Sequence, residues 1–72
     1  MTNETMQYIV ARLIERAREA KSEFDSNRDN SFASGRSEAY YEMLDILKSE
    51  LDAAGQDLSE YGLDFDLVGE LA

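Results

Sequence analysis

Apolar residues in the first third of the chain recur at alternating intervals of four and three residues. They are Met6, Val10, Leu13, Ala17, Ala20 and Phe24. This spacing keeps the side chains on one helix face, because an α-helix has 3.6 residues per turn. We therefore predict a helix over about residues 3–26. The polar segment that follows predicts a turn over 27–30, with Asn30 or Ser31 capping the next helix.

A second apolar series predicts a helix over about residues 31–54. Its members are Phe32, Ala39, Met43, Ile46, Leu47 and Leu51. Gly55 comes next, and glycine is the usual residue just past a helix C-terminus because it adopts the left-handed conformation without strain. A four-residue turn between two helices predicts an antiparallel hairpin. Residues whose numbers sum to about 56 then face one another, which places Val10 near Ile46.

The remaining residues, 55–72, form a tail with two helix-capping signals. Asp57 and Glu60 have the spacing of a capping box, which predicts one helical turn ending at Gly62. Asp66 could cap a last turn. We expect the apolar residues of the tail to pack over the hairpin or across a second copy of the chain. The whole chain, 1–72, is interpreted as a single all-α domain.

The apolar surface is wider than two helices can cover, since large side chains flank both predicted seams. A chain of 72 residues buries a thin core and usually needs a disulfide, a metal or association to supplement it. There is no cysteine and no histidine. We therefore expect a homodimer, in which two hairpins form a four-helix bundle. The predicted interface residues are Ile9, Ile14, Tyr40, Tyr41, Leu44, Tyr61 and Phe65.

The formal charge of −9 belongs to the second half of the chain, where Lys48 is the one basic residue among ten acids. This argues against nucleic acid or an anionic membrane as partner, because both require a basic surface. It leaves a basic protein as a candidate partner. The hairpin register places Arg18 near Glu38, and Arg12 near Glu42 and Asp45. The predicted acidic surface consists of Glu38, Glu42, Asp45 and Asp52.

This acidic surface permits a second function. Carboxylates one helical turn apart lie about 6 Å from each other, similar to successive phosphates of a nucleic acid. The protein could therefore act as a decoy that inhibits a basic nucleic-acid-binding protein. The alternative is that the acids only keep a small protein soluble. The chain has neither a membrane-length apolar run nor a signal-peptide pattern, so we expect a cytoplasmic protein.

The turn partly matches a calcium-binding EF-hand loop. Loop positions one, three, five and seven are occupied by Asp25, Asn27, Asp29 and Ser31. Position six is Asn30 instead of glycine, and position twelve is Arg36 instead of a bidentate carboxylate. We therefore predict a solvated turn with no metal site.

Carboxylates at helical spacing also raise the possibility of an enzyme. Glu42 and Asp45 form a Glu-x-x-Asp pair that resembles a motif of the all-α nucleotide pyrophosphohydrolases, and this resemblance implies magnesium-dependent hydrolysis. The facing glutamates would be Glu15, Glu19 and Glu23, but the adjacent Glu-Glu pair of that family is missing. Without His or Cys, no conventional base–nucleophile pair is available to activate a serine. We predict a non-catalytic protein with no cofactor.

The segment from Gly35 to Asp45 contains Gly-Arg-x-x-Ala-Tyr-Tyr-Glu-x-Leu. It resembles a segment that opens the second helix of small, uncharacterised helical-hairpin proteins of bacterial phages and mobile elements. The resemblance covers eleven residues and implies the hairpin fold and the genomic setting. It implies no activity.

Overall fold

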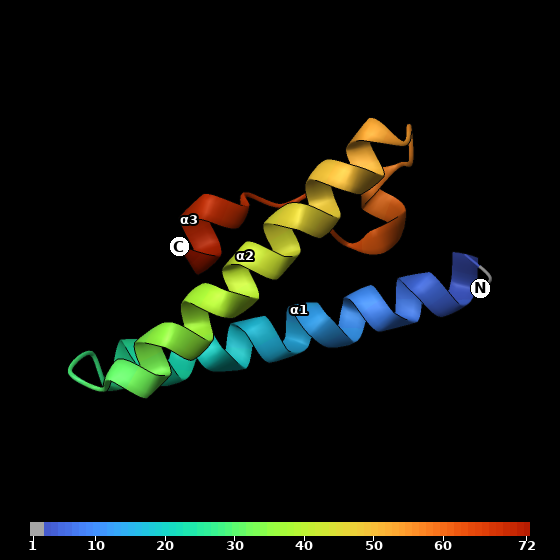
Figure 1. The fold of residues 1–72 in the computed structure, drawn as a ribbon. Helices are drawn as coiled ribbons and strands as arrows, with labels where there is room; N and C mark the ends of the chain where they lie inside the picture. Colours follow the sequence, from blue (N-terminus) through green and yellow to red (C-terminus); the bar gives the residue numbers. More distant parts are fainter. Residues whose placement is uncertain (1–2) are drawn as a thin grey trace.

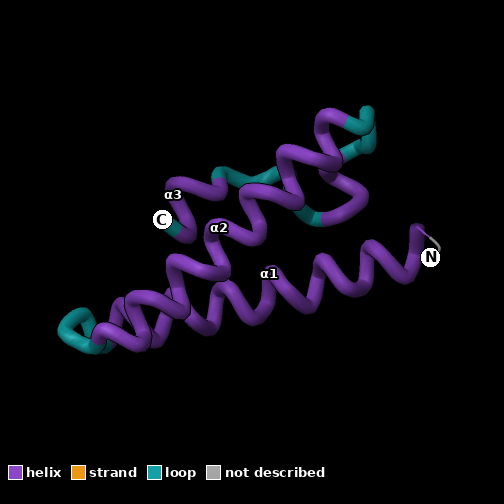
Figure 2. Tube along the Cα trace, viewed as in Figure 1, coloured by secondary structure: helices purple, strands orange, loops and turns teal. Residues whose placement is uncertain are grey.

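The computed structural model describes residues 3–72, which form helices joined by short turns, with no strand among them (Figures 1 and 2). Two long helices, α1 (Asn3–Ser26) and α2 (Ser31–Ala53), pack together as an antiparallel hairpin. A short 3-10 helix η1 (Leu58–Tyr61) and a short helix α3 (Leu67–Leu71) follow. Both contact α1 and α2, so the tail folds back along the hairpin.

Local capping residues set the ends of α2 as the sequence predicts. The side-chain oxygen of Asn30 accepts a hydrogen bond from the backbone N–H of Ala33 at 3.0 Å. At the other end, Gly55 has a φ of +76°, and the next N–H, of Gln56, donates to the carbonyl of Leu51 at 2.9 Å. This pattern satisfies carbonyl groups that the last helical turn would otherwise leave without partners.

The two helical turns of the tail also begin at the predicted caps. The carboxylate of Asp57 accepts from the N–H of Ser59 at 3.0 Å, and η1 ends at Gly62 with a φ of +70°. The carboxylate of Asp66 accepts from the N–H of Gly69 at 3.1 Å and starts α3. These caps turn the chain twice within fifteen residues, so that the tail runs back along the hairpin.

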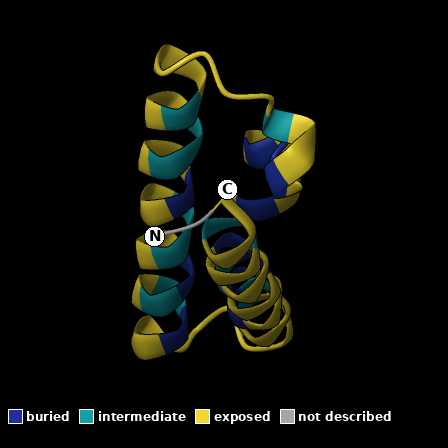
Figure 3. Cartoon of the chain, turned by 90° about the vertical axis from the view of Figure 1, so that its right-hand side faces the viewer, coloured by how far each residue is buried: buried dark blue, intermediate teal, exposed yellow. Residues whose placement is uncertain are grey.

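The hydrophobic core lies where the tail meets the two long helices. Val10, Leu44 and Leu63 are completely buried, one each from α1, α2 and the tail. In Figure 3 the buried residues lie on the sides of the elements that face one another, whereas the outer side of α2 is exposed along its length. The tail contributes half of the buried core cluster, which consists of Val10, Ile14, Ala17, Leu44, Tyr61, Leu63, Leu67 and Leu71.

The predicted inner face of α2 is wrong in part: Leu47 and Leu51 do pack against the core, but other members of the series do not. Phe32, Met43 and Ile46 are exposed, whereas Ala33 and Leu44 are buried. The cause is the tail, which packs on the side of α2 that carries Leu44 and rotates that side into the core. Near the turn the buried small residues are Ala17, Ala20, Ala33 and Ser37, whereas Gly35 and Ala39 of α2 are exposed.

The predicted ion pairs between the two long helices are replaced by others. Arg18 pairs with Glu70 of α3 at 3.4 Å and stacks on the ring of Phe65, 5.0 Å from its centroid. Arg12 pairs with Glu15 of its own helix at 3.6 Å. Arg18 therefore fastens the tail to α1 and does not neutralise the acids of α2.

Candidate interaction surface

One side of α2 carries large apolar residues that neither α1 nor the tail covers. Phe32 is 74% exposed, Met43 42% and Ile46 62%. They belong to a series with intervals of four, three, four, three and four residues, so all of its members lie along one side of the helix. We call this series the outer stripe; it consists of Phe32, Arg36, Ala39, Met43, Ile46 and Glu50.

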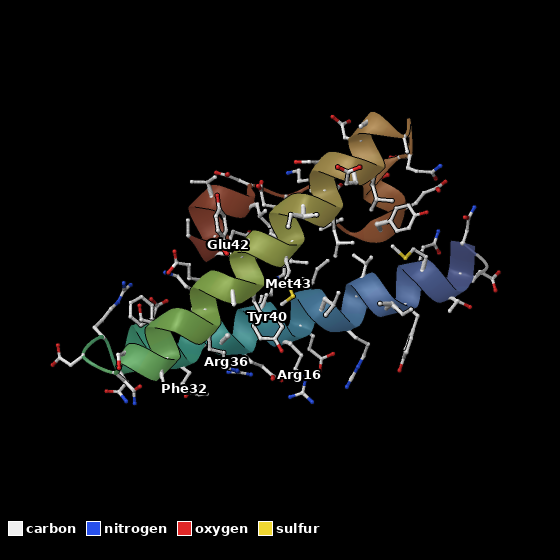
Figure 4. The ribbon with its side chains drawn as sticks, viewed as in Figure 1. Arg16, Phe32, Arg36, Tyr40, Glu42 and Met43 are labelled. Atoms are coloured by element: carbon white, nitrogen blue, oxygen red, sulfur yellow. The ribbon has the colours of Figure 1, made fainter. Side chains whose placement is uncertain are left out.

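The outer stripe borders α1. Figure 4 shows Tyr40 and Met43 extending from α2 toward α1, while Glu42 lies on the opposite edge of α2, toward α3. Tyr40 is half-buried and packs against the core cluster. On α1, Ile9 is 38% exposed and Leu13 is half-buried. The stripe and these side chains form an apolar area that the tail leaves open.

Arg36 is the most constrained residue of the outer stripe. One guanidinium nitrogen, Nη1, lies 3.0 Å from a carboxylate oxygen of Glu23 on α1. The guanidinium carbon lies 5.5 Å from the centroid of the Tyr40 ring, within cation–π range. The arginine side chain is 27% exposed, so it is held in place but reachable. Glu50, fourteen residues further along the stripe, is exposed.

The residues predicted for the interface fall into two groups. Ile14, Leu44 and Tyr61 are buried inside the single chain, where the tail covers them. For example, a Cβ built on Gly62 of the tail would lie 3.7 Å from Cδ1 of Ile14. The chain therefore covers these three itself. The remaining four keep accessible surface, and they are Ile9, Tyr40, Tyr41 and Phe65.

Sequence reasoning missed the outer stripe as a surface because it assigned Phe32, Met43 and Ile46 to the seam with α1. The four-three spacing was visible, but it was attributed to the inner face of the hairpin. An apolar side of a helix has the same four-three spacing whether it faces α1 or the solvent, so the spacing alone does not distinguish these two positions.

The predicted acidic surface lies on the other side of α2. Glu38, Glu42, Asp45 and Asp52 are all exposed, and none of them forms a salt bridge within residues 3–72. Asp45 and Asp52 line a groove of about 290 Å³ against α3, together with Asp66. Asp45 and Asp52 therefore lie beside the tail, in a groove that Lys48 also lines.

Several of the carboxylates considered for metal binding are paired with cations, whereas Glu42 and Asp45 form no salt bridge within residues 3–72. Asp25 at the turn contacts both Lys21, at 3.3 Å, and Arg28. Glu15, Glu19 and Glu23 pair with Arg12, Arg16 and Arg36, respectively. Within residues 3–72 there is no group of three or more acidic or other ligating side chains arranged to hold a metal ion.

No helix in the described part of the chain, residues 3–72, combines the length and apolar character needed to cross a membrane. Comparisons with protein-family models, with curated proteins and with solved structures gave no match. The exposed surfaces of residues 3–72 are therefore the features that bear on function.

Proposed function

We propose that the protein is a non-catalytic interaction module that forms a homodimer through the outer stripe and the adjoining surface of α1. The observation that carries this proposal is the exposure of Phe32, Met43 and Ile46 along one helix side. Exposure of this apolar surface to water is unfavourable, and burying it lowers the free energy by about 25 cal/mol per Å². Two hairpins facing each other in this way would form the four-helix bundle.

The size of the chain fits this proposal. The described residues expose 4709 Å². A standard interface buries about 800 Å² per partner, which is about a sixth of this surface. The apolar members of the outer stripe run from Phe32 to Ile46, which lie fourteen residues apart, or about 21 Å along the helix. A helix side of this length, together with the adjoining surface of α1, can bury an area on the order of 800 Å².

The test compares two exposed apolar residues with the same exposure. Ile46 and Val68 are both 62% exposed, but Ile46 lies on the outer stripe and Val68 on α3. We expect sedimentation equilibrium to show a dimer for the wild type and for Val68→Asp, and a monomer for Ile46→Asp. Circular dichroism checks that both variants fold. A wild-type monomer at all concentrations up to about 100 μM would contradict the homodimer.

The second candidate function is inhibition of a basic nucleic-acid-binding protein. It is favoured by the exposed and unbridged carboxylates of the acidic surface described above. The two functions differ in their response to salt. Binding of a basic protein through exposed carboxylates should weaken steeply as the salt concentration rises, whereas the apolar dimer contact should change little.

A further inference from the structure

Two members of the outer stripe carry opposite charges and lie at equal distances from Met43. Arg36 lies seven residues before Met43, and Glu50 lies seven residues after it. Seven residues correspond to about 10.5 Å of helix on either side. A surface with this arrangement is self-complementary in one orientation only, which is the condition for a two-fold symmetric contact.

Resting on the proposed homodimer, we infer that the two α2 helices cross the interface antiparallel, with Met43 at the two-fold axis. Arg36 of each copy then lies beside Glu50 of the other copy. The same register places Ala39 opposite Leu47 and Tyr40 opposite Ile46. In each pair a side chain that is exposed in the single chain, Ala39 or Ile46, thus meets a larger, half-buried one, Leu47 or Tyr40.

The parallel orientation is disfavoured by the same charges. It would place Arg36 beside Arg36 of the second copy and Glu50 beside Glu50, and like charges that face each other across helices are destabilising. The other side of α2 also repels a second copy, since it carries the acidic surface. Electrostatics therefore direct the second copy to the outer stripe and select its orientation.

Arg36 is suited to hold a second carboxylate. A guanidinium has five N–H donors in a planar fork, and the ion pair with Glu23 engages Nη1. The contact with the Tyr40 ring restricts the side chain, so less conformational entropy is lost when Glu50 of a second copy binds.

Charge exchange tests the orientation. We expect Arg36→Glu and Glu50→Arg each to raise the dissociation constant of the dimer about tenfold, because each converts two attractive contacts into repulsive ones. The double variant R36E/E50R should dimerise about tenfold more tightly than R36E. Both of these variants lose the contact with Glu23, so their difference reports the contact between copies. Glu23→Gln is the control, and it should leave the dissociation constant within about threefold of the wild type.

Cross-linking tests the position of the axis. Because the chain contains no cysteine, Met43→Cys introduces a single thiol. We expect M43C to form an interchain disulfide on mild oxidation and Ser49→Cys, on the α3 side of α2, to form none. A dimeric wild type in which R36E/E50R is no tighter than R36E, or in which M43C does not cross-link, would overturn the antiparallel arrangement but not the homodimer. A monomeric wild type would overturn both.

Discussion

The ammonium group of Lys48 donates a hydrogen bond to the main-chain carbonyl oxygen of Phe65, with 2.8 Å between the two atoms. This contact joins the C-terminal part of α2 to the segment between η1 and α3. Lys48 is the one basic residue in the second half of the chain. Its charge thus serves to fix the tail, which in turn covers Ile14 and Leu44.

Replacement of Lys48 by methionine keeps most of the aliphatic stem and removes the donor. We expect K48M to lower the free energy of unfolding by about 1–2 kcal/mol, because a charged hydrogen bond is lost and a partly buried carbonyl loses its partner. Urea unfolding measures this change. Arg12→Met is the control and should cost less than about 0.5 kcal/mol, since the pair with Glu15 is exposed. Equal effects of both variants would show that the Lys48 contact does not hold the tail.

Two neighbouring residues of α2 test which side of this helix faces the core. Leu44 is completely buried and Ile46 is 62% exposed. We expect Leu44→Ala to cost about 2–4 kcal/mol of unfolding free energy, through lost burial and the cavity left behind. Ile46→Ala should cost less than about 0.5 kcal/mol when measured at concentrations where the protein is monomeric. A larger cost for Ile46→Ala than for Leu44→Ala would show that Ile46 faces the core, as the sequence predicts.

The contrast between Leu44 and Ile46 shows why the sequence predicts the helices better than their packing. The 4-3 spacing from Met6 to Phe24 predicts a helix over residues 3–26, and α1 has these bounds. In α2 the apolar residues cover two sides. Phe32, Met43 and Ile46 make the stronger pattern, yet the buried residues of α2 are Ala33, Ser37 and Leu44.

The choice between the two sides of α2 depends on contacts with the tail, which are distant in sequence. Leu63 and Leu67 pack into the core together with Leu44, and this leaves the outer stripe exposed. Local periodicity contains no information on such a contact. The candidate site could therefore not be located from the sequence, because it is the side of α2 that the tail does not use.

Two glycines should respond to alanine with opposite signs. Gly35 lies within α2, and a Cβ added there has no atom within 4 Å. Gly35→Ala should therefore stabilise the protein by about 0.5–1 kcal/mol through helix propensity. Gly62 has a φ of +70°, and Gly62→Ala should destabilise it by about 1 kcal/mol because an L side chain is strained in this conformation.

Gly55 provides the matched control for these substitutions. Its φ is +76° and its surroundings are open, whereas a Cβ on Gly62 would meet Ile14 at an ordinary contact distance. Gly55→Ala and Gly62→Ala should therefore cost the same within about 0.5 kcal/mol, since both costs arise from the backbone. Thermal unfolding of the three glycine-to-alanine variants measures these changes in stability. A much larger cost at Gly62 would mean that packing against Ile14 is tighter than the structure shows.

The stability that the cap residue Asp57 contributes depends on pH. The carboxylate of Asp57 accepts hydrogen bonds from the hydroxyl of Ser59 at 2.7 Å and from its backbone N–H at 3.0 Å. These bonds, the hydroxyl's first, hold the pKa of Asp57 below its ordinary value of 3.8. The carboxylate thus stabilises the folded state above that ordinary pKa, and the stabilisation is lost as the pH falls through the lowered value.

Asp57→Asn keeps a side-chain oxygen at the cap and removes the charge. We expect the wild type to melt at a higher temperature than D57N at about pH 7, and the difference to shrink as the pH falls to about 2. The other carboxylates titrate in both proteins, so the difference between the two melting curves isolates Asp57. A difference that stays constant over this pH range would mean that the cap acts through its hydrogen-bond geometry and that the charge of the carboxylate contributes nothing.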